Sequence, residues 1–193
     1  KSQWRVIKDP ANDRIETLFD TSAFINGPDV SIFESNFASF IGTEHAVGTS
    51  NGTDAIKLSL KVLNVKPGDE VLTAANTFVA TVGAICEIGA VPVFVDCNDT
   101  FCMETSLIEE KITRKTAAIV PVHFSGYMVD MRNISKLAEH YNLLVVEDAC
   151  QSILANIKKK NSGTWGITGA FSLHPLKNIN VWSDGGIITT NDK

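Results

Sequence analysis

Short apolar runs rich in valine and isoleucine alternate along this chain with amphipathic stretches, and this alternation constrains the fold more than any other feature. Strands buried on both faces of a parallel sheet have nearly continuous apolar sequences, and the helices between them cover the sheet. The pattern therefore predicts an α/β fold with three layers, α/β/α, around a mainly parallel seven-stranded sheet. The expected strands lie near Glu44–Val47, Glu70–Ala74, Val91–Val95, Ala117–Val122, Leu143–Glu147, Gly169–Ser172 and Gly185–Thr190.

The stretches between these strands have apolar residues at three- and four-residue spacing, which is typical of amphipathic helices. Residues 1–40 are expected to form an N-terminal helical segment, and residues 41–193 a single large domain. The lysine-rich run 158–163 is interpreted as a solvated hairpin tip. The expected helices are Asp54–Leu63, Phe78–Ile88, Ser106–Lys111 and Asn133–His140.

Composition narrows the classes of partner. The chain has 17 basic and 22 acidic residues and a formal net charge of −5, so nucleic acid is not an expected partner. No apolar run approaches the ~20 residues of a membrane helix, and the first residues lack the apolar core of a secretory signal, so no membrane association and a cytoplasmic location are expected. The four cysteines show no metal-ligand spacing, so no metal site is expected.

Lys177 and Asp148 are the residues that most directly indicate a chemistry, because each follows an apolar strand. The lysine amine can form a Schiff base with the aldehyde of pyridoxal 5'-phosphate (PLP). The aspartate can keep the pyridine nitrogen protonated, so that the ring accepts electrons. Each residue alone has an ordinary alternative, a solvated loop charge for the lysine and a helix cap for the aspartate.

A candidate phosphate site follows the first strand in the sequence Gly48-Thr-Ser-Asn-Gly52-Thr53-Asp54. Glycine lets the backbone approach an anion, and the free amides at a helix start favour negative charge. Thr53 is expected to cap the helix with its hydroxyl, and Ser172 could add a second contact from another loop. The alternative is a plain helix cap that binds no ligand.

Three further side chains could line the same cleft. Phe78 could stack on a planar heterocycle, or it could simply be part of the core. Gln151 could reach the cleft with its amide, or it could lie on the surface. His123 is expected to satisfy a neighbouring hydrogen-bond partner rather than to act as a general base, since the lysine released from its Schiff base can carry protons.

Taken in order, these motifs resemble those of the sugar aminotransferases of the DegT/amino-hydroxybenzoate synthase family, which are fold-type I PLP-dependent enzymes. The resemblance extends over nearly the whole chain. It rests on the motifs Gly27…Phe33-Glu34…Phe37-Ala38, Asn51-Gly-Thr-Asp-Ala55, Asn76-Thr-Phe-Val-Ala-Thr81, His123…Gly126, Glu147-Asp-Ala-Cys-Gln151, Phe171-Ser172, Lys177-Asn178 and Asp184-Gly-Gly186.

The resemblance implies a role for each candidate residue. Lys177 would be the Schiff-base lysine and proton shuttle, and Asp148 would pair with the pyridine nitrogen. Phe78 would stack on the ring, and Gln151 would lie near the cofactor's hydroxyl or the amino donor. The phosphate would be held by Gly52, Thr53, Asp54 and Ser172.

The implied reaction is ping-pong transfer of an amino group, usually from glutamate, to the keto group of a nucleotide-linked sugar. Such reactions serve amino-sugar, surface-polysaccharide or antibiotic-sugar biosynthesis. The family resemblance also implies a homodimer that shares its active sites. Its deoxygenating members carry histidine in place of the lysine, so Lys177 favours transamination over dehydration.

Some features depart from the family pattern. Leu173 and Ser183 stand where an aromatic residue and a glycine are usual in the family. The resemblance also leads us to expect that these 193 residues lack the C-terminal small domain that completes the substrate cleft in family members. A second hypothesis is therefore a catalytically incomplete binding or regulatory domain that retains the fold. A nucleotide-binding doubly wound domain is the third, although the chain lacks its glycine signatures and this function would leave Lys177 and Asp148 unexplained.

Overall fold

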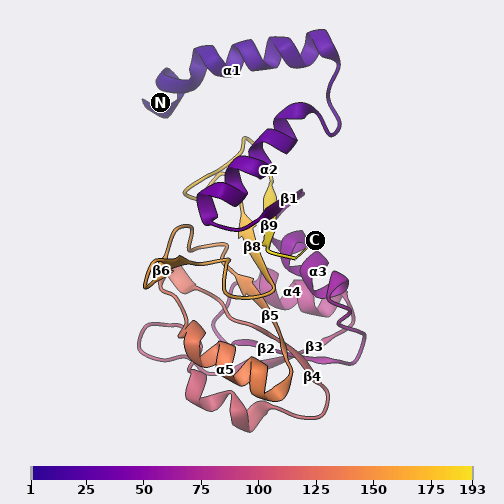
Figure 1. Ribbon diagram of the computed structural model, residues 1–193, viewed down its shortest axis with the longest axis vertical. Coiled ribbons are helices and arrows are strands. Elements are labelled where there is room, and N and C mark those ends of the chain that lie inside the picture. Colours follow the sequence, from indigo (N-terminus) through magenta and orange to yellow (C-terminus); the bar gives the residue numbers. More distant parts are fainter. Residues whose placement is uncertain (1, 193) are drawn as a thin grey trace.

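The structure, a computed structural model, describes residues 2–192 and contains one seven-stranded sheet with the strand order β1-β9-β8-β5-β4-β2-β3 (Figure 1). β9 runs antiparallel to both of its neighbours, and the other pairings are parallel. The expected mainly parallel sheet is confirmed. Its strands are β1 (His45–Thr49), β2 (Glu70–Ala74), β3 (Val91–Val95), β4 (Thr116–Val120), β5 (Leu144–Asp148), β8 (Thr168–Ser172) and β9 (Gly186–Thr190).

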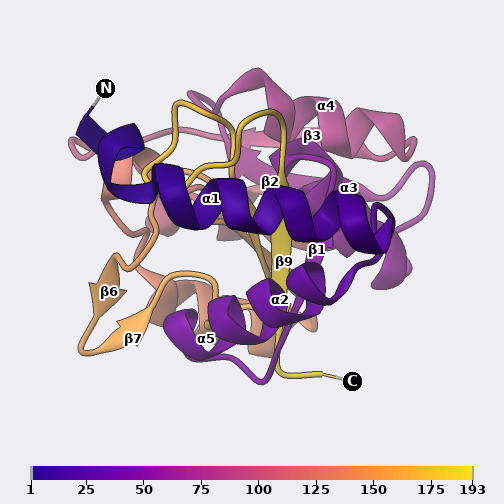
Figure 2. The same cartoon turned by 90° about the horizontal axis from the view of Figure 1, so that it is seen from above.

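Helices cover both faces of the sheet, which gives the expected three layers (Figure 2). On one face, α3 (Gly52–Val62) and α4 (Val79–Glu87) bury Ile56, Leu60 and Ile85 against alternate strand residues. On the other face, α5 (Met131–Tyr141) and α2 (Pro28–Ile41) complete two further apolar clusters. Burial of this apolar area is the main source of stability for the layered arrangement.

The first helix, α1 (Ser2–Thr21), lies largely outside the layers and crosses one end of the molecule (Figures 1 and 2). Its Trp4 packs edge-on against Trp182, with the ring centroids 5.8 Å apart. α2 differs, because its last turn buries Phe37 and Ile41 in the core. The division of the chain near residue 40 stays a prediction.

Three short segments complete the fold. The expected helix at Ser106–Lys111 was wrong, because the structure has two 3-10 turns there, η1 (Thr105–Leu107) and η2 (Glu109–Lys111). A third 3-10 turn, η3 (Phe124–Gly126), follows β4. The small strands β6 (Asn156–Ile157) and β7 (Lys160–Asn161) form a hairpin whose turn residues Lys158 and Lys159 are exposed, as the lysine run predicted. Among the described residues, no helix has the length and apolar character needed to span a membrane.

The carboxyl ends of the parallel strands meet at one edge of the sheet, and α3 and α4 begin there. β1, β2, β5 and β8 deliver the segments that follow Thr49, Ala74, Asp148 and Ser172 to this edge. Ligands of open α/β sheets bind at this edge, where connecting loops and helix N-termini converge. The topology therefore gathers the candidate residues from distant parts of the chain.

Candidate active site

Lys177 and Asp148 line the same cavity of about 370 Å³ at this edge of the sheet. Asp148 ends β5, and Lys177 lies in the loop between β8 and β9. The cavity is also lined by other residues singled out in the sequence, which are Gly52, Thr53, Phe78, Gln151 and Ser172. The chain thus brings an amine, a carboxylate, a helix start and an aromatic ring to one cavity.

The Asp148 carboxylate is 5% exposed and is held by two donors. The Thr81 hydroxyl donates to Oδ2 at 2.7 Å, and the Cys150 backbone N–H donates to Oδ1 at 3.1 Å. Within residues 2–192, Asp148 forms no ion pair with a basic side chain. A nearly buried carboxylate without a cationic partner suits a ligand that brings its own positive charge.

The N-terminus of α3 lies at the cavity, which Asn51, Gly52 and Thr53 line. Its cap is Asn51, whose side-chain oxygen accepts from the Asp54 N–H at 2.7 Å, so the cap expected at Thr53 was wrong. Gly52 is required here, because a Cβ atom on it would lie 2.8 Å from the Ser172 Cβ and 2.9 Å from the Cys150 Sγ. Since Asn51 engages the amide of Asp54, the first two helical residues are those whose N–H groups remain available to a ligand.

Asp54 is the one predicted cofactor residue that does not line the cavity. Its carboxylate pairs with Lys57 at 2.5 Å and accepts a hydrogen bond from Ser50. Hydrogen bonds from Lys57 and Ser50 lower the pKa of Asp54 below its ordinary value. The side chain of Asp54 therefore stabilises the start of the helix, and its negative charge is not presented to the cavity.

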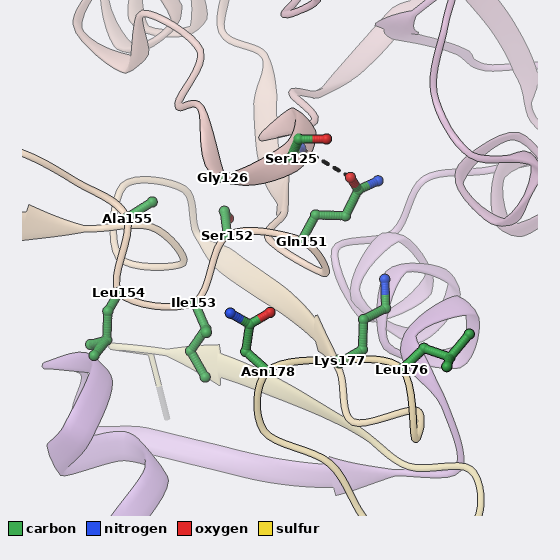
Figure 3. A pocket seen from close by; sticks show the side chains of 10 residues that line it. All are labelled: Ser125, Gly126, Gln151, Ser152, Ile153, Leu154, Ala155, Leu176, Lys177 and Asn178. Carbon is green, nitrogen blue, oxygen red and sulfur yellow. Dashed lines mark hydrogen bonds between the residues drawn. The ribbon is translucent and has the colours of Figure 1, made fainter.

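A second cavity of about 540 Å³ adjoins the first and shares Gln151, Leu176 and Lys177 with it (Figure 3). The Gln151 side-chain oxygen accepts from the Ser125 N–H at 3.0 Å, and the dashed line in Figure 3 marks this bond. Ser125 itself has a left-handed backbone conformation, with φ 50°. The amide nitrogen of Gln151 is thus left for a ligand.

Cys150 lines the same cavity as Asp148 and Lys177. Burial is the main cause that raises the pKa of its thiol well above the usual value, and the negative charge of Asp148 adds to this effect. The positive charge of Lys177 partly offsets it. Cys150 is therefore a neutral thiol at neutral pH, and it packs against Gly52 instead of acting as a nucleophile.

His123 is fully buried and bonded to Glu147, as the sequence interpretation expected for a strand-end histidine. Its Nε2 lies 2.8 Å from a Glu147 oxygen, and its Nδ1 accepts from the Val129 N–H at 3.3 Å. Because Nδ1 accepts, the ring proton lies on Nε2 and is donated to Glu147. His123 therefore has a structural role, and it does not line either cavity.

Three residues to which the sequence motifs assign no role also contribute to the site or its support, namely Asn51, Thr81 and Glu147. Thr77 precedes the N-cap of α4 and Thr81 lies in its first turn, so helical spacing alone does not indicate their contact. The partners of Glu147 lie 16 to 24 residues away along the chain, and no local pattern indicates them.

Comparisons with known proteins agree with this geometry. The chain is 40% identical over 191 residues to a "Pleiotropic regulatory protein" of Geobacillus stearothermophilus, covering 98% of this chain and 51% of the relative. It is 42% identical over 181 residues to a "dTDP-3-amino-3,4,6-trideoxy-alpha-D-glucose transaminase" of Micromonospora megalomicea subsp. nigra, covering 93% and 48% of the two chains. A crystal structure of NtdA from Bacillus subtilis, with bound cofactor PMP, has a TM-score of 0.88 and 38% identity.

That alignment covers 96% of this chain and 42% of the solved one. The chain thus spans about half the length of the curated relatives it matches. The family model matches residues 6–193, which is nearly the whole of this chain. The chain belongs to the DegT/DnrJ/EryC1/StrS aminotransferase family.

Proposed function

We propose that this chain binds PLP and contributes the cofactor half of an enzyme that transfers an amino group to a nucleotide-linked keto-sugar, with glutamate as the donor. The observation that carries the proposal is that Lys177 and Asp148, 29 residues apart in sequence, line one cavity together with a helix start and an aromatic ring. The family membership and a relative solved with bound PMP support the same cofactor.

The residues of the cavity fit PLP at each of its functional groups. The amides of Gly52 and Thr53 and the hydroxyl of Ser172 would bind the phosphate, since helix N-termini favour anions. Phe78, which is 65% exposed beside the cavity, has a ring face free to cover the heterocycle. Asp148 would accept a hydrogen bond from the pyridine nitrogen and keep its proton in place.

When bound, PLP supplies an electron sink for the bonds at the amino carbon. The chain itself supplies proton transfer and orientation. Lys177 lines both cavities, so its amine would be placed to hold a proton at the boundary between the cofactor and the substrate. The amide nitrogen of Gln151, fixed by Ser125, would donate to an oxygen at the boundary of the two cavities.

The second cavity suits the sugar. Apart from Lys177, its polar lining consists of the uncharged side chains Ser125, Gln151, Ser152 and Asn178. Hydroxyl and amide groups of this kind can pair with the hydroxyls of a sugar ring without leaving a charge buried. Relatives named as transaminases of nucleotide-linked amino sugars support this substrate class.

The cofactor assignment is tested with purified chain and PLP. We expect a visible absorbance band on binding, and we expect borohydride to attach the cofactor permanently to Lys177, as located by peptide mass spectrometry. The matched variant is Lys177→Ala, with Lys136→Ala, an exposed lysine on α5, as the control. Binding with an unchanged spectrum by Lys177→Ala would overturn the assignment.

A regulatory or binding role is the second candidate, because a 40% identical relative carries the name of a regulatory protein. Incubation of the PLP-loaded chain with glutamate separates the two functions. Release of 2-oxoglutarate supports the transaminase, whereas a loaded but inert chain supports the regulatory domain.

We further propose that two copies of the chain associate. The first two helices and their connection expose large apolar side chains, among them Phe19, Phe24 and Ile25. Large apolar side chains left exposed in neighbouring segments of a chain are often covered at an interface. Sedimentation equilibrium measures the association, and a purely monomeric species at all concentrations would contradict it.

A further inference from the structure

Thr81 is a buried hydroxyl that faces the site and has no role in the function proposed above. It lies in the first turn of α4 with no exposed surface, and its Oγ1 lies 2.7 Å from the Asp148 Oδ2. A carboxylate oxygen has no proton to give when ionised, so the threonine hydroxyl is the donor.

A second hydroxyl orders the first. The Thr77 and Thr81 Oγ1 atoms lie 2.7 Å apart, and distance alone leaves the donor open. Because the Thr81 proton is directed to Asp148, the Thr77 hydroxyl must donate to Thr81. The result is a directed chain from Thr77 through Thr81 to Asp148, in which each bond strengthens the next.

We propose that Thr81, oriented by Thr77, is a positioning residue that aims the Asp148 carboxylate at the pyridine nitrogen of the cofactor. This inference rests on the proposed PLP site. A hydroxyl that donates to one oxygen of a carboxylate fixes the rotation of that group. With Thr81 on Oδ2 and the Cys150 N–H on Oδ1, the remaining acceptor positions are directed to the cavity that Asp148 lines.

The position of α4 supports this role. Phe78 is the residue before the first turn of the helix, and the Thr81 N–H donates to the Phe78 carbonyl at 3.1 Å. The N-cap residue and the first turn of α4 therefore carry, respectively, the ring that would cover the heterocycle and the hydroxyl that holds its counter-ion.

The test compares two ligands that differ in one atom. PLP carries the pyridine nitrogen, and its deaza analogue has a C–H group in that place. We expect Thr81→Val, which removes the hydroxyl at nearly constant volume, to weaken PLP binding roughly 10- to 100-fold. Binding of the deaza analogue should change less than about threefold, because that ligand makes no bond to Asp148.

Three further variants distinguish a positioning role of the Thr81 hydroxyl from a general loss of stability. Thr81→Ser keeps the hydroxyl and should retain PLP affinity, and Thr77→Val should produce a smaller loss with the same ligand dependence. Thr73→Val is the matched control, since Thr73 is equally buried but donates to the Val120 carbonyl at 3.0 Å. It should leave the ratio of the two affinities unchanged.

The outcomes are distinct. An equal loss for PLP and the deaza analogue in Thr81→Val, or no loss for either, would overturn the inference while leaving the PLP site intact. If Thr81→Val does not fold, the ratio measured with Thr77→Val decides. Failure of the unsubstituted chain to bind either ligand would instead refute the proposed function, and the inference with it.

Discussion

Glu147 offers a sharp test of how the site is supported, because its buried carboxylate accepts four hydrogen bonds. One oxygen accepts from the Trp165 and Gly166 N–H groups at 2.6 and 2.8 Å. The other accepts from the Gly163 N–H at 2.9 Å and from His123 at 2.8 Å. All four partners are donors, so the position requires a group that only accepts.

The substitution Glu147→Gln keeps the shape and replaces one oxygen by a donor NH₂ group. If the NH₂ group faces Trp165 and Gly166, two backbone donors lose their acceptor. If it faces His123, the imidazole could accept only by moving its proton to Nδ1, which would then confront the Val129 N–H. No arrangement satisfies every donor, and the loss of two charge-assisted bonds corresponds to about 3–5 kcal/mol of unfolding free energy.

Chemical denaturation followed by tryptophan fluorescence measures this loss. The control is Glu139→Gln, an exposed carboxylate on α5, which should change the free energy of unfolding by less than about 0.5 kcal/mol. A loss below about 1 kcal/mol for Glu147→Gln would show that the four donors find other acceptors and that the carboxylate is not required.

The packing around Gly52 and Cys150 makes two further predictions. Gly52→Ala should lower the free energy of unfolding by about 1–3 kcal/mol and weaken PLP binding, because its Cβ would lie 2.8 Å from the Ser172 Cβ. Gly83→Ala, whose Cβ would meet no atom within 4 Å, should instead gain up to about 1 kcal/mol, and equal losses in both variants by denaturation would contradict the close approach. Iodoacetamide should modify the exposed Cys86 well before Cys150, because burial raises the pKa of the Cys150 thiol well above its usual value of 9.0. The rate at which Cys150 is modified should therefore still rise with pH above 9.0. Equal modification rates of the two cysteines at about pH 8, measured by mass spectrometry, would refute this.

The strands and most helices could be predicted because their signals are local. β2 and β3 have the bounds that the apolar runs indicated, and β5 differs by one residue at each end. The spacing of apolar residues within a strand or helix depends only on near neighbours, which a single sequence contains. The register of the sheet and the antiparallel direction of β9 depend on contacts between distant segments, and the sequence pattern did not predict them.

Short elements show the limit of the same reasoning. The stretch expected to be helical at Ser106–Lys111 is too short to offset the cost of starting an α-helix, so it forms two 3-10 turns, the first of them capped by the Glu104 side chain. At the start of α3, both Asn51 and Thr53 are good capping residues, and composition could not choose between them. The choice falls on Asn51 because its backbone is extended, at φ −168°, whereas Thr53 is already inside the helix.

The adjacent carboxylates Glu147 and Asp148 show why the chemistry of a residue could not be separated from its structural role by sequence alone. Successive residues of a strand point to opposite faces of the sheet, so these two side chains diverge although they are neighbours. Glu147 turns to the side of Val145, where backbone donors and His123 satisfy it fully, and it is used entirely in folding. Asp148 turns to the side of Val146 and α4, where two donors hold it but leave it without a cation. Asp148 is thus the carboxylate that the fold leaves without a cation beside a cavity that also contains the Lys177 amine, and for this reason we propose it, rather than Glu147, as the partner of the cofactor.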